Sequence, residues 1–416
     1  MSQCPHLNIL DPGLYRGGAP HQEIARQRHI EPVYWLDNDA LVGEGVWVVT
    51  TRAELDHVAK NPQLFSSREN TCVIHEKGTG VDLDMMRLQM INMDPPEHIK
   101  FRRVVRSVFT PSAVDAYEPR LRAIVKDTID RVCERGECEF VADVAAPLPL
   151  ATICEFLGVP ERDYAQISEW LDIALSGGDP ELGYTAEDRA NAGLQIYMYA
   201  HKRQEHFRKE PTDNLLSQLI AGEVDGVSLT PEEVNSFCVL LFSGGLETTR
   251  TVSSHGMRLL LEHPDQMRYL QDNPERIPDF VEEVLRYNAA INFMIRTATG
   301  DTTLGGKEIK KGQLVMMLYH GANHDESIFA EPGRFDITRP QREDVRNNHR
   351  AFGIGQHFCI GSHLARLQLL VLFEEILSRL QNPRLTGEMT WLQSYFLNAI
   401  KSMPMAFDAA GPSPEP

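Results

Sequence analysis

The sequence lacks both a long hydrophobic run and a surplus of basic residues. No stretch of about 18 uninterrupted apolar residues occurs, the length needed to cross a bilayer as a helix, so we expect no membrane partner. The 416 residues include 41 Lys and Arg against 59 Asp and Glu, which gives a formal net charge of −18. Because nucleic-acid binding needs surplus positive charge to neutralise phosphates, this composition argues against a nucleic-acid partner.

Paired cysteine motifs and a secretory leader are also missing. The seven cysteines are scattered, no pair of CxxC motifs occurs, and no histidine pair at zinc-finger spacing follows Cys133 and Cys138. The N-terminus has neither the basic start nor the apolar core of a secretory signal. We therefore expect a cytoplasmic protein whose thiols are reduced and mostly buried, with Cys359 as the exception.

What is present is the composition of an ordinary globular protein, with 42% hydrophobic and 24% charged residues. The pattern is mostly helical from about residue 96 to 286 and rich in Thr, Gly and short strands from 293 to 311. Further predicted elements are a strand over 45–51, a long helix from Thr230 to about 262, and a last long helix from near 359 to about 379. No linker divides the chain. We predict one mainly α domain over 1–416 with a small β-rich part, less ordered at 1–20 and 408–416.

The most informative segment is Phe352-Gly353-Ile354-Gly355-Gln356-His357-Phe358-Cys359-Ile360-Gly361. Two glycines allow a tight turn, and Cys359 then lies at a predicted helix start. Backbone N–H groups and the helix dipole there stabilise an anion and lower the pKa of a thiol, which favours a thiolate ligand. A buried cysteine after a Gly-rich turn fits the same residues, so the cysteine alone leaves both interpretations open.

The whole string, Phe-Gly-x-Gly-x-His-x-Cys-x-Gly, resembles the haem-binding loop of soluble bacterial cytochrome P450 monooxygenases. The resemblance implies that Cys359 is the metal ligand of a haem b. It also implies that Phe352 packs near the sulfur, that His357 faces a propionate, and that Gly361 lets the haem approach the next helix. The implied fold is that of the cytochrome P450 family, with the haem between the long central helix and the helix after the cysteine loop.

Two adjacent glycines, Gly244 and Gly245, lie inside the predicted long helix, where each costs about 1 kcal/mol relative to alanine. A notch for a flat cofactor and close helix–helix packing both explain this cost. Ser243-Gly244-Gly245-Leu246-Glu247-Thr248 resembles the family's oxygen-binding stretch, which implies that Gly244 and Gly245 border the cofactor. The resemblance also implies that Glu247 and Thr248 are the catalytic acid–alcohol pair, because splitting dioxygen needs two protons.

Charged motifs follow in the family's order. Glu283-x-x-Arg286 is a helical pair of little weight alone, but its position resembles the family's Glu-x-x-Arg, and Arg334 resembles the third member of that structural triad. Haem propionates need cations, because buried carboxylates without partners are costly. His98 and Arg102 lie one helical turn apart and resemble a propionate clamp, and Arg296 resembles another propionate-binding residue. His349 fits the pattern less well, because Arg350 follows it.

The substrate is expected to be a hydrophobic small molecule, with a faint resemblance to bacterial relatives that act on steroids or terpenoids. We predict that Met86, Leu241, Asn292, Phe293 and Phe396 belong to its pocket. The chain has no flavin or nicotinamide fingerprint, so electrons must come from a partner. The resemblance implies that an acidic ferredoxin with its reductase supplies these electrons. It also implies that O2 is the second substrate and that the protein is a monomer. A basic patch of Arg102, Arg103, Arg106, Arg350 and Arg366 is expected to bind it.

Two other functions remain compatible with a haem-thiolate site: a sensor or binding protein without turnover, and a peroxide-driven hydroxylase. A sensor has no need of a proton relay, and peroxide-driven relatives tend to lose the acid–alcohol pair. Glu247 and Thr248 therefore favour the O2-dependent monooxygenase.

Overall fold

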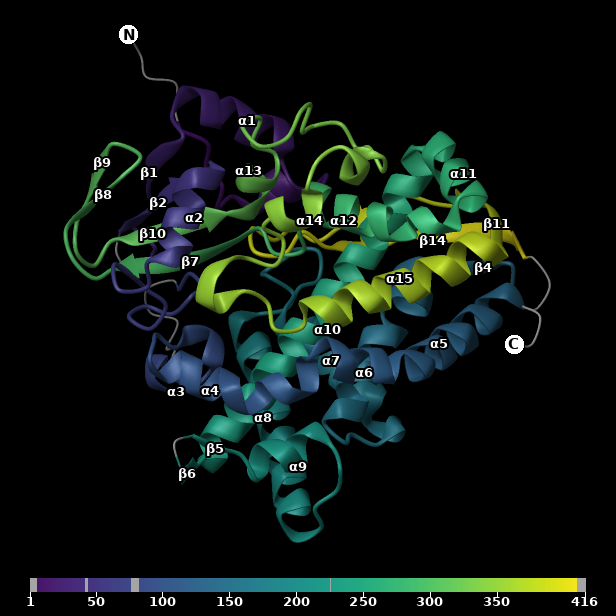
Figure 1. Cartoon of the computed structure of the whole chain (residues 1–416), viewed down its shortest axis with the longest axis horizontal. Coiled ribbons are helices and arrows are strands. Elements are labelled where there is room, and N and C mark those ends of the chain that lie inside the picture. The colour runs from purple at the N-terminus through teal and green to yellow at the C-terminus, as the bar shows by residue number, and fades with distance from the viewer. Residues whose placement is uncertain (1–5, 42–43, 76–81, 225, 410–416) are drawn as a thin grey trace.

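The computed structural model describes residues 6–41, 44–75, 82–224 and 226–409, and it divides into a helical part and a smaller sheet-containing part (Figure 1). The helices are α1 (His21–Ile30), α2 (Arg52–Lys60), α3 (Leu83–Arg87), α4 (Glu97–Val105), α5 (Pro111–Cys133), α6 (Pro147–Phe156), α7 (Tyr164–Ala174), α8 (Ala186–Lys209), α9 (Leu215–Ile220), α10 (Pro231–Glu262), α11 (Pro264–Asp272), α12 (Ile277–Tyr287), α13 (Tyr319–Asn323), α14 (Val345–Asn348) and α15 (Ser362–Arg379). Short 3-10 turns include η1 (Pro12–Tyr15), η2 (Met90–Asn92) and η8 (Gly355–His357).

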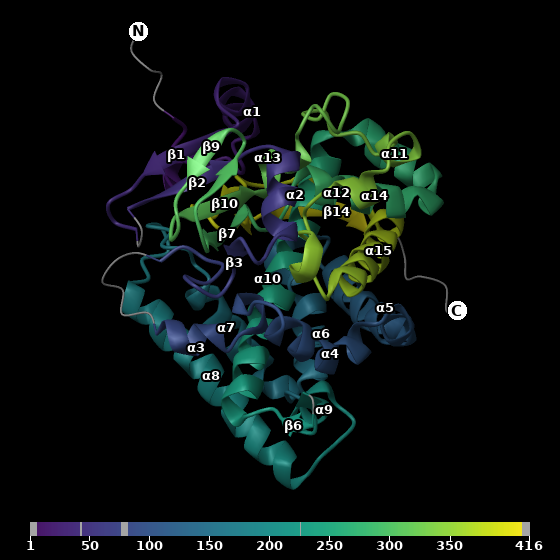
Figure 2. The same cartoon turned by 60° about the vertical axis from the view of Figure 1, so that its left-hand side comes forward.

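The strands are β1 (Val33–Asp37), β2 (Gly45–Val49), β3 (Phe65–Ser66), β4 (Glu137–Glu139), β5 (Glu223–Val224), β6 (Val227–Ser228), β7 (Phe293–Ala298), β8 (Thr302–Leu304), β9 (Lys307–Ile309), β10 (Leu314–Leu318), β11 (Leu380–Leu385), β12 (Thr390–Trp391), β13 (Ile400–Ser402) and β14 (Pro404–Ala409). The main sheet has the order β1-β2-β10-β7-β3. In Figure 2 this sheet lies at the upper left, with α1, α2 and α13 near it and α3 to α9 below.

Strand β7 divides two environments because its side chains alternate. It pairs antiparallel with β10, with Ile295 opposite Met316 and Arg296 opposite Val315. Phe293 and Ile295 are buried in the apolar cluster that also holds Val46 and Val48 of β2. Met294 and Arg296 point the other way, into the cavity described below, as a period of two requires.

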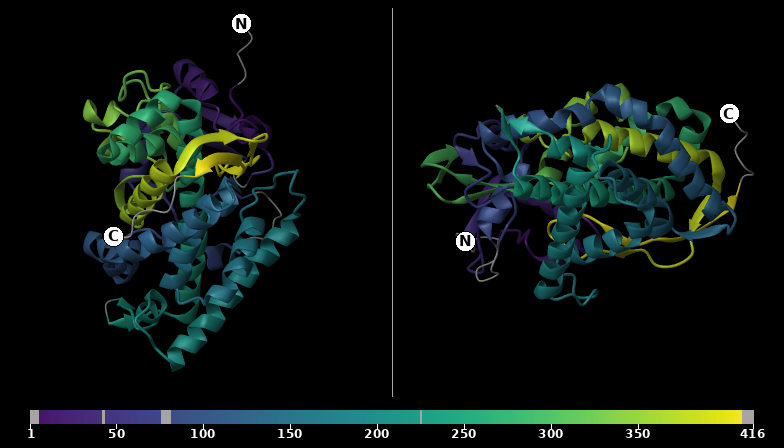
Figure 3. Two further views of the ribbon diagram at one scale, coloured as in Figure 1. Left: turned by 90° about the vertical axis from the view of Figure 1, so that its right-hand side faces the viewer. Right: turned by 90° about the horizontal axis from the view of Figure 1, so that it is seen from below.

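The long helix α10 crosses the middle of the molecule, where Figure 3 shows it from below. Its start follows the predicted chemistry: the Thr230 hydroxyl accepts from the Glu233 N–H at 3.2 Å, and the Glu233 carboxylate accepts from the Thr230 N–H at 2.8 Å. This reciprocal capping box satisfies two helix-end donors. The helix ends at Glu262, as predicted, and most of its length is buried.

Helix α15 packs along α5 and α12 beside α10, which makes the helical core continuous (Figure 1). Strands β11 and β14 follow it and pair antiparallel with each other. This arrangement confirms the predicted mainly α fold with a small β-rich part. It also places the loop before α15 against the middle of α10.

Residues 6–20, expected to be less ordered, pack against the first sheet, with Ile9 and Tyr15 buried in the same cluster as Tyr34. The Tyr15 hydroxyl donates to the Ile9 carbonyl at 2.9 Å. Residues 408 and 409 belong to β14, while 1–5 and 410–416 lie outside the described residues. Among the helices that the structure describes, none combines the length and the apolar character that a membrane span requires.

Candidate active site

A cavity of about 490 Å³ lies between the middle of α10 and the loop that precedes α15. Such a volume is in the usual range for small-molecule and cofactor sites. Its wall includes Gly244 and Thr248 of α10, Cys359 and Gly361 of the cysteine loop, and Arg296 of β7. The site therefore assembles residues more than 100 positions apart in the sequence.

The cysteine loop is held by its own backbone. Gly353 and Gly355 have φ values of 68° and 74°, in the left-handed region that other residues rarely adopt. At Gly355 a Cβ atom would lie 2.7 Å from the Ala59 carbonyl oxygen of α2. The Cys359 N–H donates to the Phe352 carbonyl at 2.9 Å, which closes the loop. The predicted role of the glycines in a tight turn is confirmed.

The surroundings of the Cys359 thiol differ from the expected ones. Burial raises the pKa of Cys359, while the Gly361 N–H and the positive charges of Arg102 and Arg366 act in the lowering direction. Helix α15 begins only at Ser362, so the first turn of the helix does not enclose the sulfur. The prediction of a lowered thiol pKa is therefore wrong for the chain itself. The Gly361 N–H and the charges of Arg102 and Arg366 would nevertheless stabilise a thiolate at this position.

Three basic side chains at the cavity wall have no carboxylate partner among the residues that the structure describes. Arg296 is buried and donates to the carbonyl of the preceding residue, Ile295, at 2.7 Å. It forms no ion pair among the described residues. Arg102 donates to the Phe358 carbonyl at 2.6 Å, also without an ion pair in the described chain. Neither ring nitrogen of the buried His98 has a hydrogen-bond partner among those residues. A buried guanidinium such as that of Arg296 is costly without a counter-charge, and the described residues offer it none.

The rings of His98 and His357 contact each other in a tilted arrangement, with centroids 4.1 Å apart and an interplanar angle of 41°. Burial, followed by the charges of Arg102 and Arg296, lowers the pKa of His98 to about 4. Burial and the Arg296 charge also lower the pKa of His357 well below its usual value. The His357 Nε2 lies 3.2 Å from the Ser67 hydroxyl. An anion placed among these groups would favour the protonated rings and offset the desolvation.

The two glycines of α10 serve different purposes. A Cβ atom on Gly244 would meet nothing within 4 Å, because this residue faces the open cavity. A Cβ atom on Gly245 would lie 2.5 Å from the Ile153 Cδ1 of α6. The notch interpretation thus applies to Gly244 and the close-packing interpretation to Gly245. Together they let a flat group lie against α10 while α6 packs beside it.

Thr248 and Glu247 point in different directions from α10. The Thr248 side chain lines the cavity, and its hydroxyl donates to the Gly244 carbonyl at 2.8 Å. The Glu247 carboxylate is buried outside the cavity lining and pairs with Arg250. Arg250 in turn pairs with Asp172 at 2.7 Å, and that aspartate is half-exposed. The acid next to Thr248 is thereby connected to the surface through two ion pairs.

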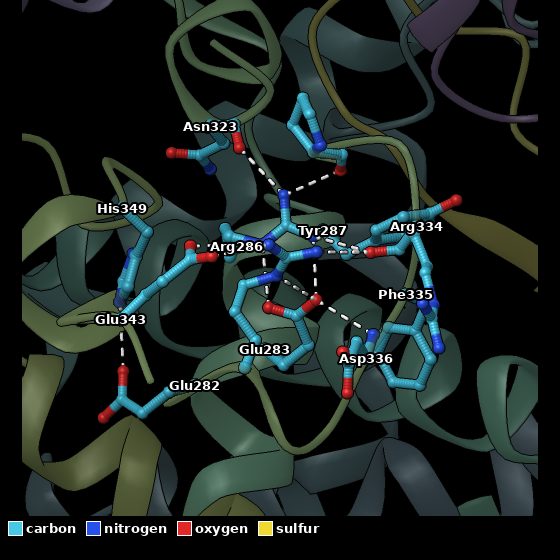
Figure 4. Close-up of polar contacts among 12 residues, drawn as sticks. Glu282, Glu283, Arg286, Tyr287, Asn323, Arg334, Phe335, Asp336, Glu343 and His349 are labelled. Atoms are coloured by element: carbon cyan, nitrogen blue, oxygen red, sulfur yellow. Dashed lines mark hydrogen bonds and ion pairs between the residues drawn. The ribbon is translucent and has the colours of Figure 1, made fainter. Parts of the chain in front are cut away.

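The buried ion-pair network behind the site corrects one predicted residue (Figure 4). Arg286 binds Glu283 through two hydrogen bonds of 2.7 and 2.8 Å, and both side chains are fully buried. The third side chain is Arg339, whose Nε donates to Glu283 at 3.1 Å. Arg334 contributes only its backbone carbonyl, and its guanidinium is 67% exposed. The prediction of Arg334 is wrong because the chain turns after Pro332 and directs that side chain outward.

Three residues expected at the haem or at a docking patch are engaged elsewhere. The His349 Nε2 lies 3.0 Å from Glu282, away from the cavity lining (Figure 4). Arg366 donates to Glu282 at 2.6 Å and lies 4.6 Å above the Phe352 ring. Arg350 is buried and pairs with Asp56 at 2.7 Å. The expected basic patch is corrected to Arg102 with the exposed Arg103 and Arg106.

Two predicted pocket residues do not reach the cavity. Phe293 points into the sheet core, where it stacks near Tyr395. The Asn292 amide donates to the Tyr395 carbonyl at 2.9 Å, and its oxygen faces His320 at 2.9 Å. Phe293 is wrong by strand parity, since Met294 on the other face of β7 lines the cavity. Asn292 is wrong because it precedes β7 and its side chain is engaged by Tyr395 and His320, while its neighbour Ile291 lines the cavity. Met86, Leu241 and Phe396 do line it.

Further residues line the cavity beside those predicted individually. They are Cys72, Val73, Gln89, Asn92, Phe237 and Tyr319. Phe237 lies on the apolar stripe of α10 that the 3.6-residue period predicts, and Leu240 adjoins this stripe. The loop residues near 72 and 89 carry no such regularity.

A cavity with a cysteine on one wall, a glycine notch opposite and unpaired cations at its edge defines a protein that binds a flat, anionic, metal-containing cofactor. The cytochrome P450 family model matches residues 185–384. A steroid C26-monooxygenase of Rhodococcus jostii (strain RHA1) is 36% identical over 412 residues, 97% of this chain and 85% of that protein. A steroid C26-monooxygenase of Mycolicibacterium smegmatis (strain ATCC 700084 / mc(2)155) is 34% identical over 97% of this chain and 94% of that protein. The chain belongs to the cytochrome P450 family.

Solved structures agree in fold. A Mycobacterium marinum cytochrome P450 in complex with pseudoionone has a TM-score of 0.88 and 31% identity, covering 98% of this chain and 100% of that one. A Bacillus megaterium protein in complex with testosterone, of 28% identity, has a TM-score of 0.83 over 94% of this chain and 98% of that one.

The protein is an O2-dependent cytochrome P450 monooxygenase, and its cofactor is a thiolate-ligated haem b. The residues present fit this group. The two carboxylates of haem b would pair with Arg102, Arg296 and His98, and the open space beside Gly244 suits a flat ring system.

Proposed function

We propose that the protein hydroxylates the terminal carbon of a steroid side chain, with Cys359 as the haem ligand. The observation that carries this proposal is the cavity bounded by Cys359 on one side and by Thr248 and the Gly244 notch on the other. Bound haem supplies the activation of O2, and a thiolate ligand favours O–O cleavage by donating electron density. Everything else is the work of the chain: orienting the haem, moving protons and excluding water.

Haem orientation follows from the charges at the cavity edge. Arg296 and His98 are fixed in position by burial, and Arg102 is fixed by its bond to the Phe358 carbonyl. In the proposal these three groups and His357 bind the two propionates. The Phe352 ring, held beneath the Arg366 guanidinium, packs near the sulfur and limits its access to water. Gly361 offers open space for the haem edge above α15.

Protons are delivered through α10. Because the Thr248 hydroxyl donates its hydrogen to the Gly244 carbonyl, its oxygen faces the cavity as an acceptor. A group that donates a hydrogen bond to this oxygen is held inside the cavity, where its proton is available for the reaction with O2. In the proposal, Glu247 carries protons from solvent toward Thr248. Its carboxylate swings away from Arg250 to do so, while Arg250 stays paired with Asp172. Glu247 and Thr248 are thus the proposed catalytic pair.

The steroid assignment rests on the relatives and on the cavity wall. The relatives of 34% and 36% identity described above are named steroid C26-monooxygenases. The part of the wall away from Cys359 is mostly apolar, with Val73, Met86, Met90, Leu240 and Phe396. Burying a steroid ring system against these side chains is favourable at about 25 cal/mol per Å². The terminal carbon of the side chain then points toward the haem.

Electrons are proposed to come from an acidic ferredoxin that docks beside α4. Arg103 and Arg106 are exposed there, next to Arg102 on the same segment. A local basic surface on a protein of net charge −18 would steer an acidic partner to this face.

The ligand assignment is tested by the carbon monoxide complex of the reduced protein. The wild type and the half-buried control Cys133→Ser are expected to give the Soret band typical of thiolate ligation, whereas Cys359→Ser loses it. The substrate assignment is tested by titrating cholesterol, testosterone and a terpene and recording the spin-state shift of the haem. Cholesterol, which carries the full side chain, should bind at least about tenfold more tightly than testosterone, a preference worth about 1.4 kcal/mol. Equal shifts with all three ligands would overturn the steroid side-chain proposal.

A further inference from the structure

Three histidines meet outside the haem cavity. His21 is the first residue of α1, His320 lies in α13, and His324 directly follows α13. The spacing of four between His320 and His324 places both rings on one face of a helical turn. One ring nitrogen of each residue lies within 4.8 Å of those of the other two. None of the three lines the cavity, so no step of the proposed reaction uses them.

One nitrogen of each ring is unpartnered: His21 Nδ1, His320 Nδ1 and His324 Nε2. Each is shielded from solvent and has no hydrogen-bond partner among the residues that the structure describes. Buried polar atoms nearly always have a hydrogen-bond partner, so three unpartnered nitrogens on neighbouring rings need an explanation.

The second nitrogen of each ring shows which form the imidazole takes. The His320 Nε2 lies 2.9 Å from the Asn292 oxygen, and the His324 Nδ1 lies 3.1 Å from the His320 carbonyl. The Asn288 side chain hydrogen-bonds the His21 ring, and Nδ1 of that ring is unpartnered, so the bond is at Nε2. All three partners are acceptors and take the ring N–H. The unpartnered nitrogens therefore carry the free lone pairs, and we take them to be the atoms that converge.

Three convergent lone pairs cannot hydrogen-bond among themselves, and one water molecule has only two hydrogens to donate. A metal cation accepts all three lone pairs at once, and ligating histidines typically donate their other N–H in this way. We propose that His21, His320 and His324 form a site for one Zn²⁺ ion, with water as the fourth ligand. Histidine nitrogens in a three-plus-water arrangement are usual for zinc.

Charges around the site are compatible with a cation. Burial lowers the pKa of His21 to about 4 and those of His320 and His324 well below the usual value, so all three rings are neutral. The nearest guanidiniums belong to Arg258 and Arg286, and each is paired with a carboxylate, Glu262 and Glu283 respectively.

The geometry requires only a small contraction. A point equidistant from three atoms that are 4.8 Å apart lies about 2.8 Å from each, compared with about 2.0–2.1 Å for a Zn–N bond. Inward movements of less than about 1 Å therefore complete the site, and the side-chain torsion next to a histidine ring is soft. The Tyr287 ring packs against His21 and His324, but its hydroxyl donates to the Gly333 carbonyl and is not a ligand. The ion would fasten α1 to α13.

The test uses the haem-loaded protein, treated with EDTA, equilibrated with Zn²⁺ and passed through gel filtration. Elemental analysis should find about one zinc per haem iron in the wild type and in the control His29→Gln, an exposed histidine on the same helix. The His21→Gln and His324→Gln variants should each retain less than about a tenth of that amount. Zinc retained equally by all four proteins, or by none, would overturn the proposal.

A second measurement does not depend on the folding of any variant. X-ray absorption at the zinc edge of the wild type should show three imidazoles at about 2.0–2.1 Å. A shell with fewer than three imidazoles would mean adventitious surface binding and would overturn the site.

Discussion

At the scale of single residues, Thr248 allows the most direct test of the proposed proton delivery. Thr248→Val keeps the shape and removes the hydroxyl that faces the cavity. Proton delivery then fails more often, so the ratio of hydroxylated product to reductant consumed should fall by about tenfold or more. Oxygen consumption and product are measured together, with Thr128→Val in α5 as the control, because its buried hydroxyl also donates to a carbonyl one turn earlier but lies outside the cavity lining. Unchanged coupling in Thr248→Val would contradict the role of this hydroxyl.

The buried arginine of the structural network offers a second test at this scale. Arg339→Ala leaves the fully buried Glu283 with one partner fewer, and breaking a buried pair costs about 3–5 kcal/mol. Arg334→Ala removes an exposed side chain and keeps the carbonyl that Arg286 and Arg339 use, so it should stay within about 0.5 kcal/mol of the wild type. Urea unfolding of both variants measures the difference. Equal losses would contradict the assignment of Arg339.

At the scale of elements, α12 and α15 are joined by the buried carboxylate of Glu282. Burial alone raises the pKa of this group, but His349 and Arg366 outweigh it and lower the pKa to about 2. A lowered carboxylate pKa stabilises the fold above the unfolded value of 4.5, and the contribution of about 3 kcal/mol is lost as the pH falls toward 2.

Glu282→Gln should therefore be less stable than the wild type at pH 6 but lose less free energy of unfolding between pH 5 and pH 3. The control is Glu275→Gln, a surface carboxylate just before α12, whose acid dependence should match that of the wild type. A Glu282→Gln variant with the full wild-type loss between pH 5 and pH 3 would contradict the pairing.

Elements were easier to predict from the sequence than the directions of their side chains. The capping chemistry of Thr230 and Glu233 and the length of α10 follow from local rules. Phe293 was misplaced because a strand buried on both faces shows no polar alternation to fix its parity. Arg334 was misplaced because the direction of a loop side chain depends on tertiary packing. Local sequence also could not show that His21 meets His320 and His324.

At the scale of the whole molecule, net charge and local charge act in opposite directions. The chain is acidic overall, yet Arg103 of α4 and Arg106, which directly follows α4, are exposed to solvent. Arg106→Glu should lower the ferredoxin-supported rate by about tenfold at low salt and weaken its salt dependence. The control Arg384→Glu lies in β11, at the opposite side of the molecule from α4 (Figure 1). Equal rates for both variants would place the donor elsewhere.

The cavity is likewise a property of the whole molecule. Its position between α10 and the cysteine loop could be predicted from the motifs, because each motif carries its own chemistry. Its far wall could not, because residues such as Val73, Gln89 and Ile153 meet only after the chain has folded. Substrate choice depends on that wall, and so the sequence motifs say most about the reaction and least about the substrate.

The central claim is that this chain inserts one oxygen atom from O2 into the terminal carbon of a steroid side chain. The most direct measurement supplies the haem-loaded protein with cholesterol, a ferredoxin and its reductase under ¹⁸O₂, and analyses the product by mass spectrometry. The account predicts a product with one ¹⁸O atom at the terminal side-chain carbon, absent in Cys359→Ser. A product that carries oxygen from water, or one hydroxylated on the ring system, would contradict it.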